Sequence, residues 1–138
     1  MVHTLDHWKQ YLTCEDDFNF LIQFVENAKN KEAVNQVMLL LAGPGGTGKS
    51  TLINEISEYL GSQNFILSDT YGSAFLQPVV QMIYIPGIDE YQKKYVQQLR
   101  NAIYFGQSVI AATNNLDKIN KDILKSTRVI KMEHVFTK

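Results

Sequence analysis

The chain has 138 residues, of which 45% are hydrophobic and 20% charged, and a formal net charge of −1. This composition is typical of one globular domain of ordinary size and excludes a disordered or fibrous chain and a coiled coil. The longest apolar run, Val37 to Ala42, is much shorter than the ~20 residues that cross a bilayer, so we expect no membrane partner.

The cysteine content indicates the cellular compartment. The single cysteine, Cys14, excludes an intrachain disulfide framework and suits a reducing environment. Residues 1–8 lack the basic stretch followed by an apolar core that marks a signal peptide. We therefore expect an intracellular protein, in the cytoplasm or nucleus of a host cell, and not a secreted one.

Charge is distributed unevenly along the chain. Residues 1–90 contain 4 Lys or Arg against 11 Asp or Glu, whereas residues 91–138 contain 9 against 3. This asymmetry is compatible with a surface that faces nucleic acid, and a solvated helix face followed by a basic tail explains it equally well.

The spacing of apolar residues predicts the elements in chain order. Residues 5–29 have helical spacing and predict one broken helix or two short helices. The apolar run Val37–Leu41 indicates a buried strand, and residues 49–60 indicate an amphipathic helix that ends at Gly61. The later elements are expected to be strand 65–67, strand 79–85, helix 91–104, strand 108–113, short helix 116–124 and strand 128–132, with residues 70–78 either a loop or one turn of helix.

From residue 37 onward, predicted strands and helices largely alternate. This alternation predicts an α/β fold in which helices cover both faces of a parallel sheet. We divide the chain into an N-terminal helical lead-in, residues 1–34, and a core, residues 35–138.

A glycine-rich segment after the first strand fits the phosphate-binding pattern G-x-x-x-x-G-K-[ST] at every fixed position. Glycines are needed because the backbone N–H groups must turn inward around a phosphate, at angles that are costly for residues with a Cβ. We expect Lys49 to reach the β- and γ-phosphates of ATP and the Ser50 hydroxyl to bind Mg²⁺. The predicted nucleotide-binding residues are Gly43, Pro44, Gly45, Gly46, Thr47, Gly48, Lys49, Ser50 and Thr51.

An acidic pair, Asp89 and Glu90, follows the third predicted strand. We expect Asp89 to hold the outer shell of the metal and Glu90 to polarise the attacking water. Pro86-Gly87 interrupts the apolar run that normally leads to such an acid, and negative residues also commonly open a helix. Asp69, after the second predicted strand, is the competing metal-site acid.

Two further polar residues follow the later strands. Asn114 comes at the end of strand 108–113, where its amide could hold the attacking water or a γ-phosphate oxygen, although Asn is also a common turn residue. Arg128 precedes the last strand and could act on the nucleotide of a neighbouring subunit, or could be an ordinary surface residue.

The order of these motifs resembles the superfamily 3 helicase-like ATPases of small DNA viruses, poxvirus-type primase-helicases, and plasmid or phage replication proteins. In that family the phosphate loop is followed by an acidic pair, by a strand ending in Thr-Asn or Ser-Asn, and by an Arg before a final strand and a Phe. The resemblance covers roughly residues 15–136, and the matching segments are Gly43–Thr51, Asp89-Glu90, Thr113-Asn114 and Arg128–Phe136. The lead-in Trp8–Ala28 is similar to the helical segment before the ATPase core of papillomavirus-type replicative helicases.

The resemblance implies a five-stranded parallel sheet of strand order 5-1-4-3-2 in a P-loop NTPase core. It implies a homo-oligomer, hexameric in the family, that hydrolyses ATP with Mg²⁺ and moves on single-stranded or forked DNA, with RNA as a possible substitute. In the roles it implies, Lys49 and Ser50 bind phosphate and Mg²⁺, Asp89 and Glu90 serve metal and water, Asn114 senses the γ-phosphate, and Arg128 is an arginine finger.

One family feature is missing. Superfamily 3 helicases insert a β-hairpin, with a basic tip that grips DNA, between the helix after the acidic pair and the Asn strand. Only 23 residues separate Glu90 from Asn114 here, and the predicted helix and strand leave Phe105-Gly106-Gln107 between them. Lys93, Lys94 and Arg100 could contact phosphates instead, or could belong to a solvated helix face.

Two other functions remain open. A small-molecule kinase would use the same phosphate loop and an acid such as Asp69, but it usually carries an Arg-rich lid, and this chain has only Arg100 and Arg128. An AAA+-like loader, or a non-catalytic oligomerisation module of a longer replication protein, would bind nucleotide through the same loop.

Overall fold

The computed structural model describes most of the helices and strands that surround the phosphate loop. The described residues are 3–12, 14–30, 35, 37–45, 47–61, 65–67, 82–85, 100–101, 103–104, 107–119, 121–125 and 127–132.

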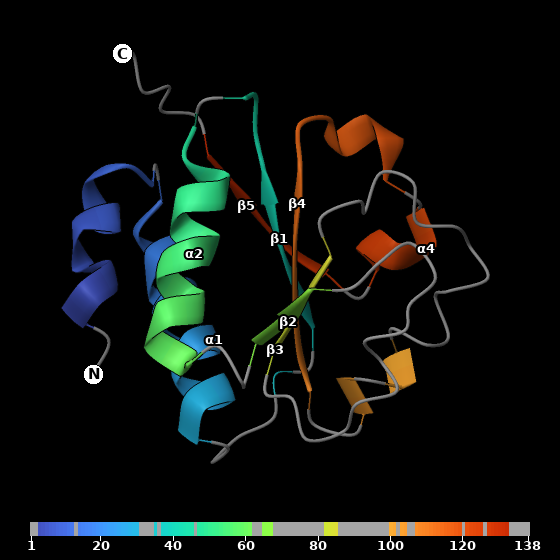
Figure 1. The fold of residues 1–138 in the computed structure, drawn as a ribbon. Coiled ribbons are helices and arrows are strands. Elements are labelled where there is room, and N and C mark those ends of the chain that lie inside the picture. The colour runs from blue at the N-terminus through green and yellow to red at the C-terminus, as the bar shows by residue number, and fades with distance from the viewer. Residues whose placement is uncertain are drawn as a thin grey trace.

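The observed elements follow the predicted order (Figure 1). In sequence they are η1 (His3–Gln10), α1 (Glu15–Asn30), β1 (Met38–Ala42), α2 (Lys49–Leu60), β2 (Phe65–Leu67), β3 (Met82–Ile85), β4 (Ser108–Thr113), η6 (Leu116–Lys118), α4 (Lys121–Leu124) and β5 (Thr127–Lys131). The N-terminal region consists of two separate helices, which is the second of the two expected forms.

Two expected elements differ in detail or are described only in part. The single short helix expected at 116–124 is two pieces, η6 and α4, because Ile119 leaves the helix with extended backbone angles. Of the helix expected at 91–104, residues 100, 101, 103 and 104 are described and are helical. Residues 70–78, and residues 79–81 of the third expected strand, lie outside the described residues.

The sheet has five strands in the order β2-β3-β4-β1-β5, and all four neighbouring pairs are parallel. Read from the other edge, this is the expected order 5-1-4-3-2. β1 therefore lies between β4 and β5, and its five residues are all buried, as expected of an interior parallel strand. This order brings the carboxyl ends of β1, β4 and β5 to one edge of the sheet.

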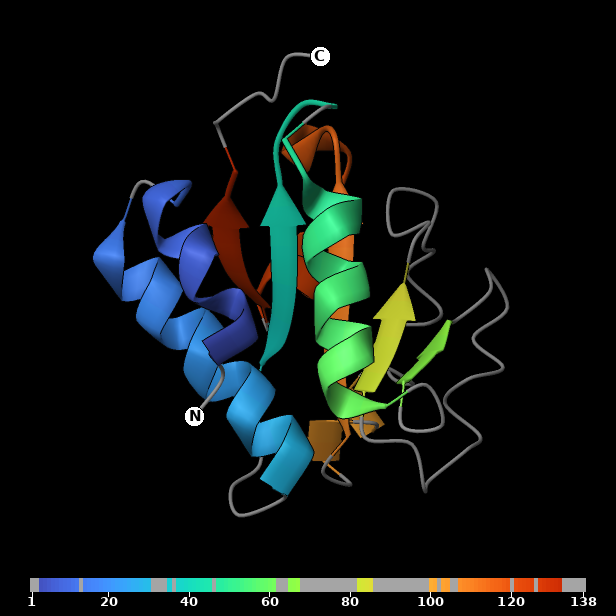
Figure 2. The same cartoon turned by 60° about the vertical axis from the view of Figure 1, so that its left-hand side comes forward.

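Two hydrophobic cores cover the two faces of the sheet. Leu39 and Leu41 of β1 pack in the core shared with η1, α1 and α2, whereas Met38 and Leu40 pack in the core shared with Ile123 of α4. Successive side chains of a strand point to opposite faces, so this run of apolar residues supplies both cores. Figures 1 and 2 show η1, α1 and α2 on one side of the sheet and α4 on the other.

Polar side chains attach the N-terminal helices to the rest of the molecule. The indole N–H of Trp8 in η1 donates a hydrogen bond to the Glu55 carboxylate of α2, and His7 Nε2 lies 3.2 Å from the second oxygen of Glu55. In α1, the backbone carbonyl oxygen of Phe24 accepts a hydrogen bond of 2.8 Å from Asn35 Nδ2. The same Asn35 nitrogen lies 2.7 Å from Ser108 Oγ at the start of β4. No described helix is long and apolar enough to cross a membrane.

Candidate functional site

The phosphate loop begins where three strands end together. Gly43 N donates to the carbonyl oxygen of Thr113 at 3.1 Å, and Met132 N donates to the carbonyl oxygen of Ala42 at 2.7 Å. These two hydrogen bonds hold the start of the loop between the ends of β4 and β5. The loop therefore leaves the sheet from a backbone position that both neighbouring strands determine.

Two glycines of the loop are required by geometry. A Cβ atom at Gly43 would come closer than 3.0 Å to the backbone carbonyl oxygen of Met132, a distance that real Cβ atoms essentially never show. Gly48, which precedes α2, has φ 86° and ψ 17°, in the left-handed region that favours glycine. Gly48 also has no side chain to cap α2, so the N–H groups of the first turn can face an anion.

The Lys49 ammonium lies within the curve of the loop. Its Nζ donates to the carbonyl oxygens of Gly43 at 2.7 Å and Pro44 at 2.8 Å, and to Thr47 Oγ1 at 3.1 Å. The Thr47 hydroxyl itself donates to the Pro44 carbonyl at 2.9 Å. Lys49 is only 8% exposed, and burial lowers the pKa of its ammonium group. Three oxygen acceptors offset part of the cost of burying this charge.

Helix α2 presents its first turn beside this cation. Its buried face consists of Leu52, Ile53, Ile56 and Leu60, which belong to the core shared with η1 and α1. Ser50 and Thr51 lie on the exposed side of the same helix. A hydroxyl in this position fits the oxygen ligands that Mg²⁺ takes, together with nucleotide phosphates and water.

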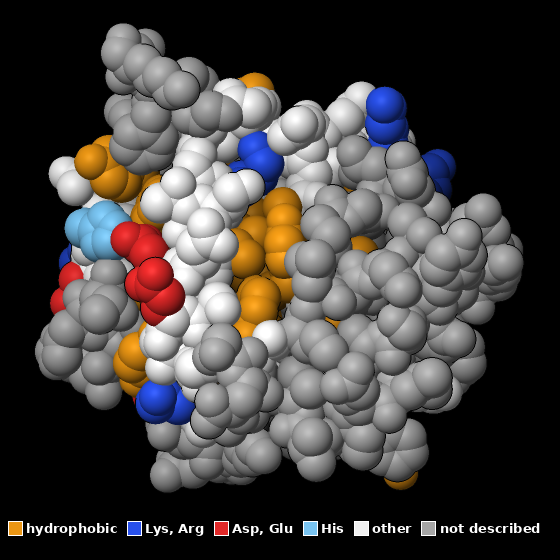
Figure 3. Space-filling view, in the orientation of Figure 1, with side chains coloured by type: hydrophobic (Ala, Val, Ile, Leu, Met, Phe, Trp, Pro, Cys, Tyr) orange, Lys and Arg blue, Asp and Glu red, His pale blue; other side chains and the backbone are white. Residues whose placement is uncertain are grey.

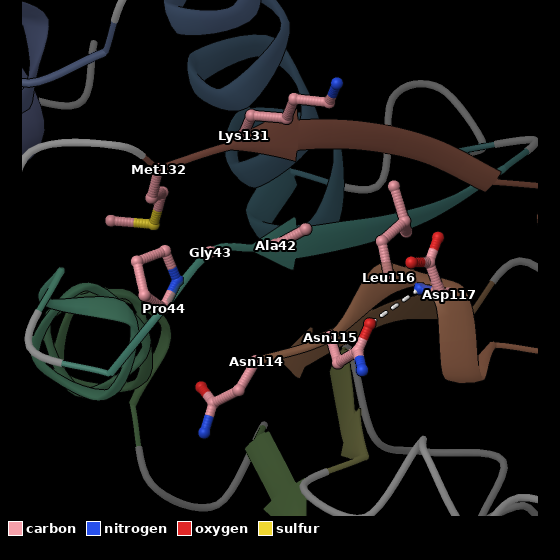
Figure 4. Close-up of a pocket in the computed structure, with 9 residues that line it drawn as sticks. All are labelled: Ala42, Gly43, Pro44, Asn114, Asn115, Leu116, Asp117, Lys131 and Met132. Atoms are coloured by element: carbon pink, nitrogen blue, oxygen red, sulfur yellow. Dashed lines mark hydrogen bonds between the residues drawn. The ribbon is translucent and has the colours of Figure 1, made fainter.

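A pocket of about 330 Å³ lies at the carboxyl ends of β1, β4 and β5 (Figure 4). Its lining residues are Ala42, Gly43, Pro44, Asn114, Asn115, Leu116, Asp117, Lys131 and Met132. In parallel α/β sheets, ligands generally bind outside the carboxyl ends of the strands. The pocket shares Gly43 and Pro44 with the phosphate loop, so the two form one continuous candidate site.

The two neighbouring asparagines at the end of β4 have different roles in the fold. Asn115 Oδ1 accepts a hydrogen bond of 3.0 Å from Asp117 N and so caps η6, while Thr113 Oγ1 accepts one of 3.0 Å from Asn115 N. Asn114 is exposed, and Figure 4 shows its side chain turned away from the capping interaction. The structure thus brings Asn114 to the pocket that includes Gly43 and Pro44, as its place at the end of the strand predicts. Its role as a γ-phosphate sensor stays a prediction.

Arg128 is placed far from the phosphate loop of its own chain. Its Cα is the register partner of Leu39, whereas Ala42, which precedes the loop, is the partner of Lys131. Three strand positions correspond to about 10 Å along the sheet. Arg128 Nη2 instead forms an ion pair of 3.0 Å with Asp17 Oδ1 of α1. The structure does not bring Arg128 and the loop of the same chain together, and action on a neighbouring subunit stays a prediction.

The remaining predicted site residues lie outside the described residues. These are Gly46 of the loop, the acidic pair Asp89 and Glu90, and the competing acid Asp69. Their roles stay predictions from the sequence.

Lys131 and Met132 line the candidate site and were not expected from the sequence. Both follow from the position of β5 beside β1, since Lys131 is the register partner of Ala42 and Met132 N is hydrogen-bonded to Ala42 O. The expected strand order already placed the end of the last strand beside the loop. The residues at that end could therefore have been identified from the strand order.

The fold is shared with solved structures of ATPases. No family model matches the sequence, and no curated protein matches it. The RuvB Holliday junction branch migration motor of Thermotoga maritima superposes with a TM-score of 0.63 at 19% identity, over 94% of this chain and 48% of that chain. The FIGL-1 AAA domain in complex with ADP gives a TM-score of 0.63 at 16% identity, over 91% of this chain and 55% of that one. A Rhizobiales Trip13 gives 0.63 at 14% identity, over 98% of this chain and 67% of that one.

The chain has the α/β fold of the P-loop NTPases. The solved structures named above are AAA+ ATPases, and this chain spans about half the length of RuvB. Because all three identities are below 20%, the likeness concerns the fold alone. The narrower resemblance to superfamily 3 helicases stays a prediction from the sequence motifs.

Proposed function

We propose that this chain binds ATP at the phosphate loop and hydrolyses it, and that hydrolysis is coupled to movement on, or remodelling of, nucleic acid. The observation that carries this proposal is the Lys49 ammonium held within the loop by the Gly43 and Pro44 carbonyl oxygens and Thr47 Oγ1. A buried cation surrounded by a glycine-rich loop and a helix N-terminus is suited to bind the phosphates of a nucleotide.

Each polar group of the site has a role in this proposal. Lys49 stabilises negative charge on the transferred phosphoryl group, and Ser50 and Asp89 hold Mg²⁺, which neutralises charge on the β- and γ-phosphates when bound. Glu90 accepts a proton from the attacking water. Asn114 orients that water or a γ-phosphate oxygen, which its place in the pocket beside Gly43 and Pro44 supports.

Arg128 acts in trans in this proposal. Its distance from the loop of its own chain supports a role only toward the nucleotide of a neighbouring subunit. The active form is therefore a homo-oligomer, hexameric by resemblance to superfamily 3 helicases. Nucleic acid, either single-stranded or forked DNA or RNA, is the proposed partner, which the net positive charge of residues 91–138 supports.

A second candidate is an AAA+-type loader or oligomerisation module that binds nucleotide without turning it over. The AAA+ folds of the solved structures favour this candidate as much as they favour a motor.

Nucleotide turnover, measured with and without single-stranded DNA, tests these candidates. We expect ATP hydrolysis that single-stranded DNA stimulates, and loss of hydrolysis with weaker ATP binding in Lys49→Ala. Binding without turnover would support the loader or module, and turnover only with a small acceptor would support a kinase. Undiminished turnover by folded Lys49→Ala protein would exclude an ATPase site at this loop.

A further inference from the structure

The Arg128 guanidinium is bound by two side chains of helix α1. Its Nη2 lies 3.0 Å from Asp17 Oδ1, and its Cζ lies 5.1 Å from the centre of the Phe20 ring. The contact joins residues 111 positions apart in the chain. It therefore connects the N-terminal helices to the edge strand β5. It also engages, within its own chain, the arginine that the proposed function directs to the nucleotide of a neighbouring subunit.

The geometry singles out Asp17 among the acids of α1. The first turn of the helix carries Glu15, Asp16 and Asp17, of which the first two are exposed. The Asp17 side chain is only 17% exposed, and that of Arg128 is 42% exposed. A carboxylate that faces the sheet needs a partner more than a solvated one does, so the pair is more than an incidental surface contact. Phe20, one turn further along α1, lies beneath the guanidinium and restricts its direction.

We propose that Asp17 and Phe20 form a latch that holds Arg128 away from the nucleotide of the neighbouring subunit, and that catalysis requires Arg128 to exchange Asp17 for that nucleotide. The inference rests on the proposed function and adds a regulatory contact within each chain. Asp17 and the nucleotide of the neighbouring subunit both present negatively charged oxygen atoms to the guanidinium group. Arg128 can pair fully with only one of them at a time.

The exchange couples the N-terminal helices to hydrolysis. An ATP molecule on the neighbouring subunit offers Arg128 a larger negative charge than Asp17 does, so assembly around bound ATP shifts the equilibrium toward the released arginine. A subunit without a loaded neighbour keeps the Asp17–Arg128 pair. Any movement of α1 away from β5 breaks the same pair and favours release.

The test compares two single-charge variants of α1. Asp17→Asn removes the latch carboxylate, and Asp16→Asn makes the same charge change one residue away, at an exposed position. We expect Asp17→Asn to raise kcat for ATP by about fivefold or more at low protein concentration, with little change in the ATP affinity of the phosphate loop. Asp16→Asn is expected to behave as the wild type. The double variant Asp17→Asn/Arg128→Ala is expected to be as inactive as Arg128→Ala.

Each outcome bears on a different claim. If Asp17→Asn hydrolyses ATP no faster than the wild type while Arg128→Ala is inactive, the latch is wrong and the trans arginine stands. If Arg128→Ala hydrolyses ATP normally, the trans role of Arg128 fails and the latch fails with it, while ATP hydrolysis at the phosphate loop stands. If the wild type hydrolyses no ATP, the proposed function itself fails. Should Asp17→Asn fail to fold, Phe20→Leu loosens the contact with the carboxylate intact, and an unchanged kcat in that variant would overturn the proposal.

Discussion

The α-carbon of Gly43 faces the backbone carbonyl oxygen of Met132 so closely that a Cβ atom at position 43 would lie within 3.0 Å of it. Met132 N is in turn hydrogen-bonded to the carbonyl oxygen of Ala42 at 2.7 Å. The end of β5 therefore packs directly on the first residue of the phosphate loop, and the loop cannot accept a side chain there without moving one of the two strands.

The first prediction concerns this contact. Gly43→Ala is expected to lower the free energy of unfolding by about 1–3 kcal/mol, because the backbone is less able to yield than a flexible side chain. Gly45→Ala is the matched control, since a Cβ at Gly45 meets nothing within 4 Å. Urea unfolding of both variants measures the difference, and equal stability of the two would contradict the close approach of Met132.

The second prediction concerns the water-activating acid. Glu90→Gln is expected to keep ATP binding and to lower turnover by about 10²–10⁴-fold, because an amide cannot accept the proton of the attacking water. Single-turnover hydrolysis and nucleotide-binding titration separate the two effects. Asp69→Asn is the control, and the same loss of turnover there, with Glu90→Gln active, would move the acidic role to Asp69.

The third prediction concerns assembly. Specific ATPase activity is expected to rise with protein concentration, because Arg128 serves a neighbouring subunit. Mixing inactive Arg128→Ala protein with inactive Lys49→Ala protein is expected to restore part of the activity, since some interfaces then pair an intact loop with an intact arginine. Constant specific activity on dilution, with no recovery on mixing, would leave Arg128 a structural residue that binds Asp17.

The fourth prediction concerns the pH dependence of stability. Burial raises the pKa of Tyr59 above its ordinary value of 10.0, and the hydrogen bond and charge of Glu26 raise that pKa further. The phenol donates to Glu26 Oε1 at 3.0 Å. Because the folded state holds this proton more tightly than the unfolded state, the contribution is complete below pH 10.0 and is lost as the pH rises through the folded pKa.

Unfolding of the wild type and of Tyr59→Phe, at pH 8 and at about pH 10.5, measures this contribution. The wild type is expected to lose more stability over that interval than Tyr59→Phe, which has no proton to release. An equal loss in both proteins would show that Tyr59 titrates alike in the folded and unfolded states.

Much of the fold was predictable because its signals are local. The apolar run of β1, the glycines at 43–48 and the amphipathic pattern of α2 each depend on residues close together in the chain. The strand order followed from the resemblance of the motif order, and the sheet has that order. The sequence predicted a single short helix at 116–124 because it could not indicate the extended backbone at Ile119 that divides η6 from α4.

The sequence by itself therefore determined the class of fold and the chemical character of the phosphate loop, because periodicity and backbone freedom are properties of neighbouring residues. Only the tertiary structure decided that the Met132 carbonyl oxygen packs against Gly43 and that Asp17 binds Arg128. These relationships depend on the register of β1 with β4 and β5 and on the way α1 packs against β5. Register and packing are set by many weak contacts between distant parts of the chain, and no local pattern encodes them.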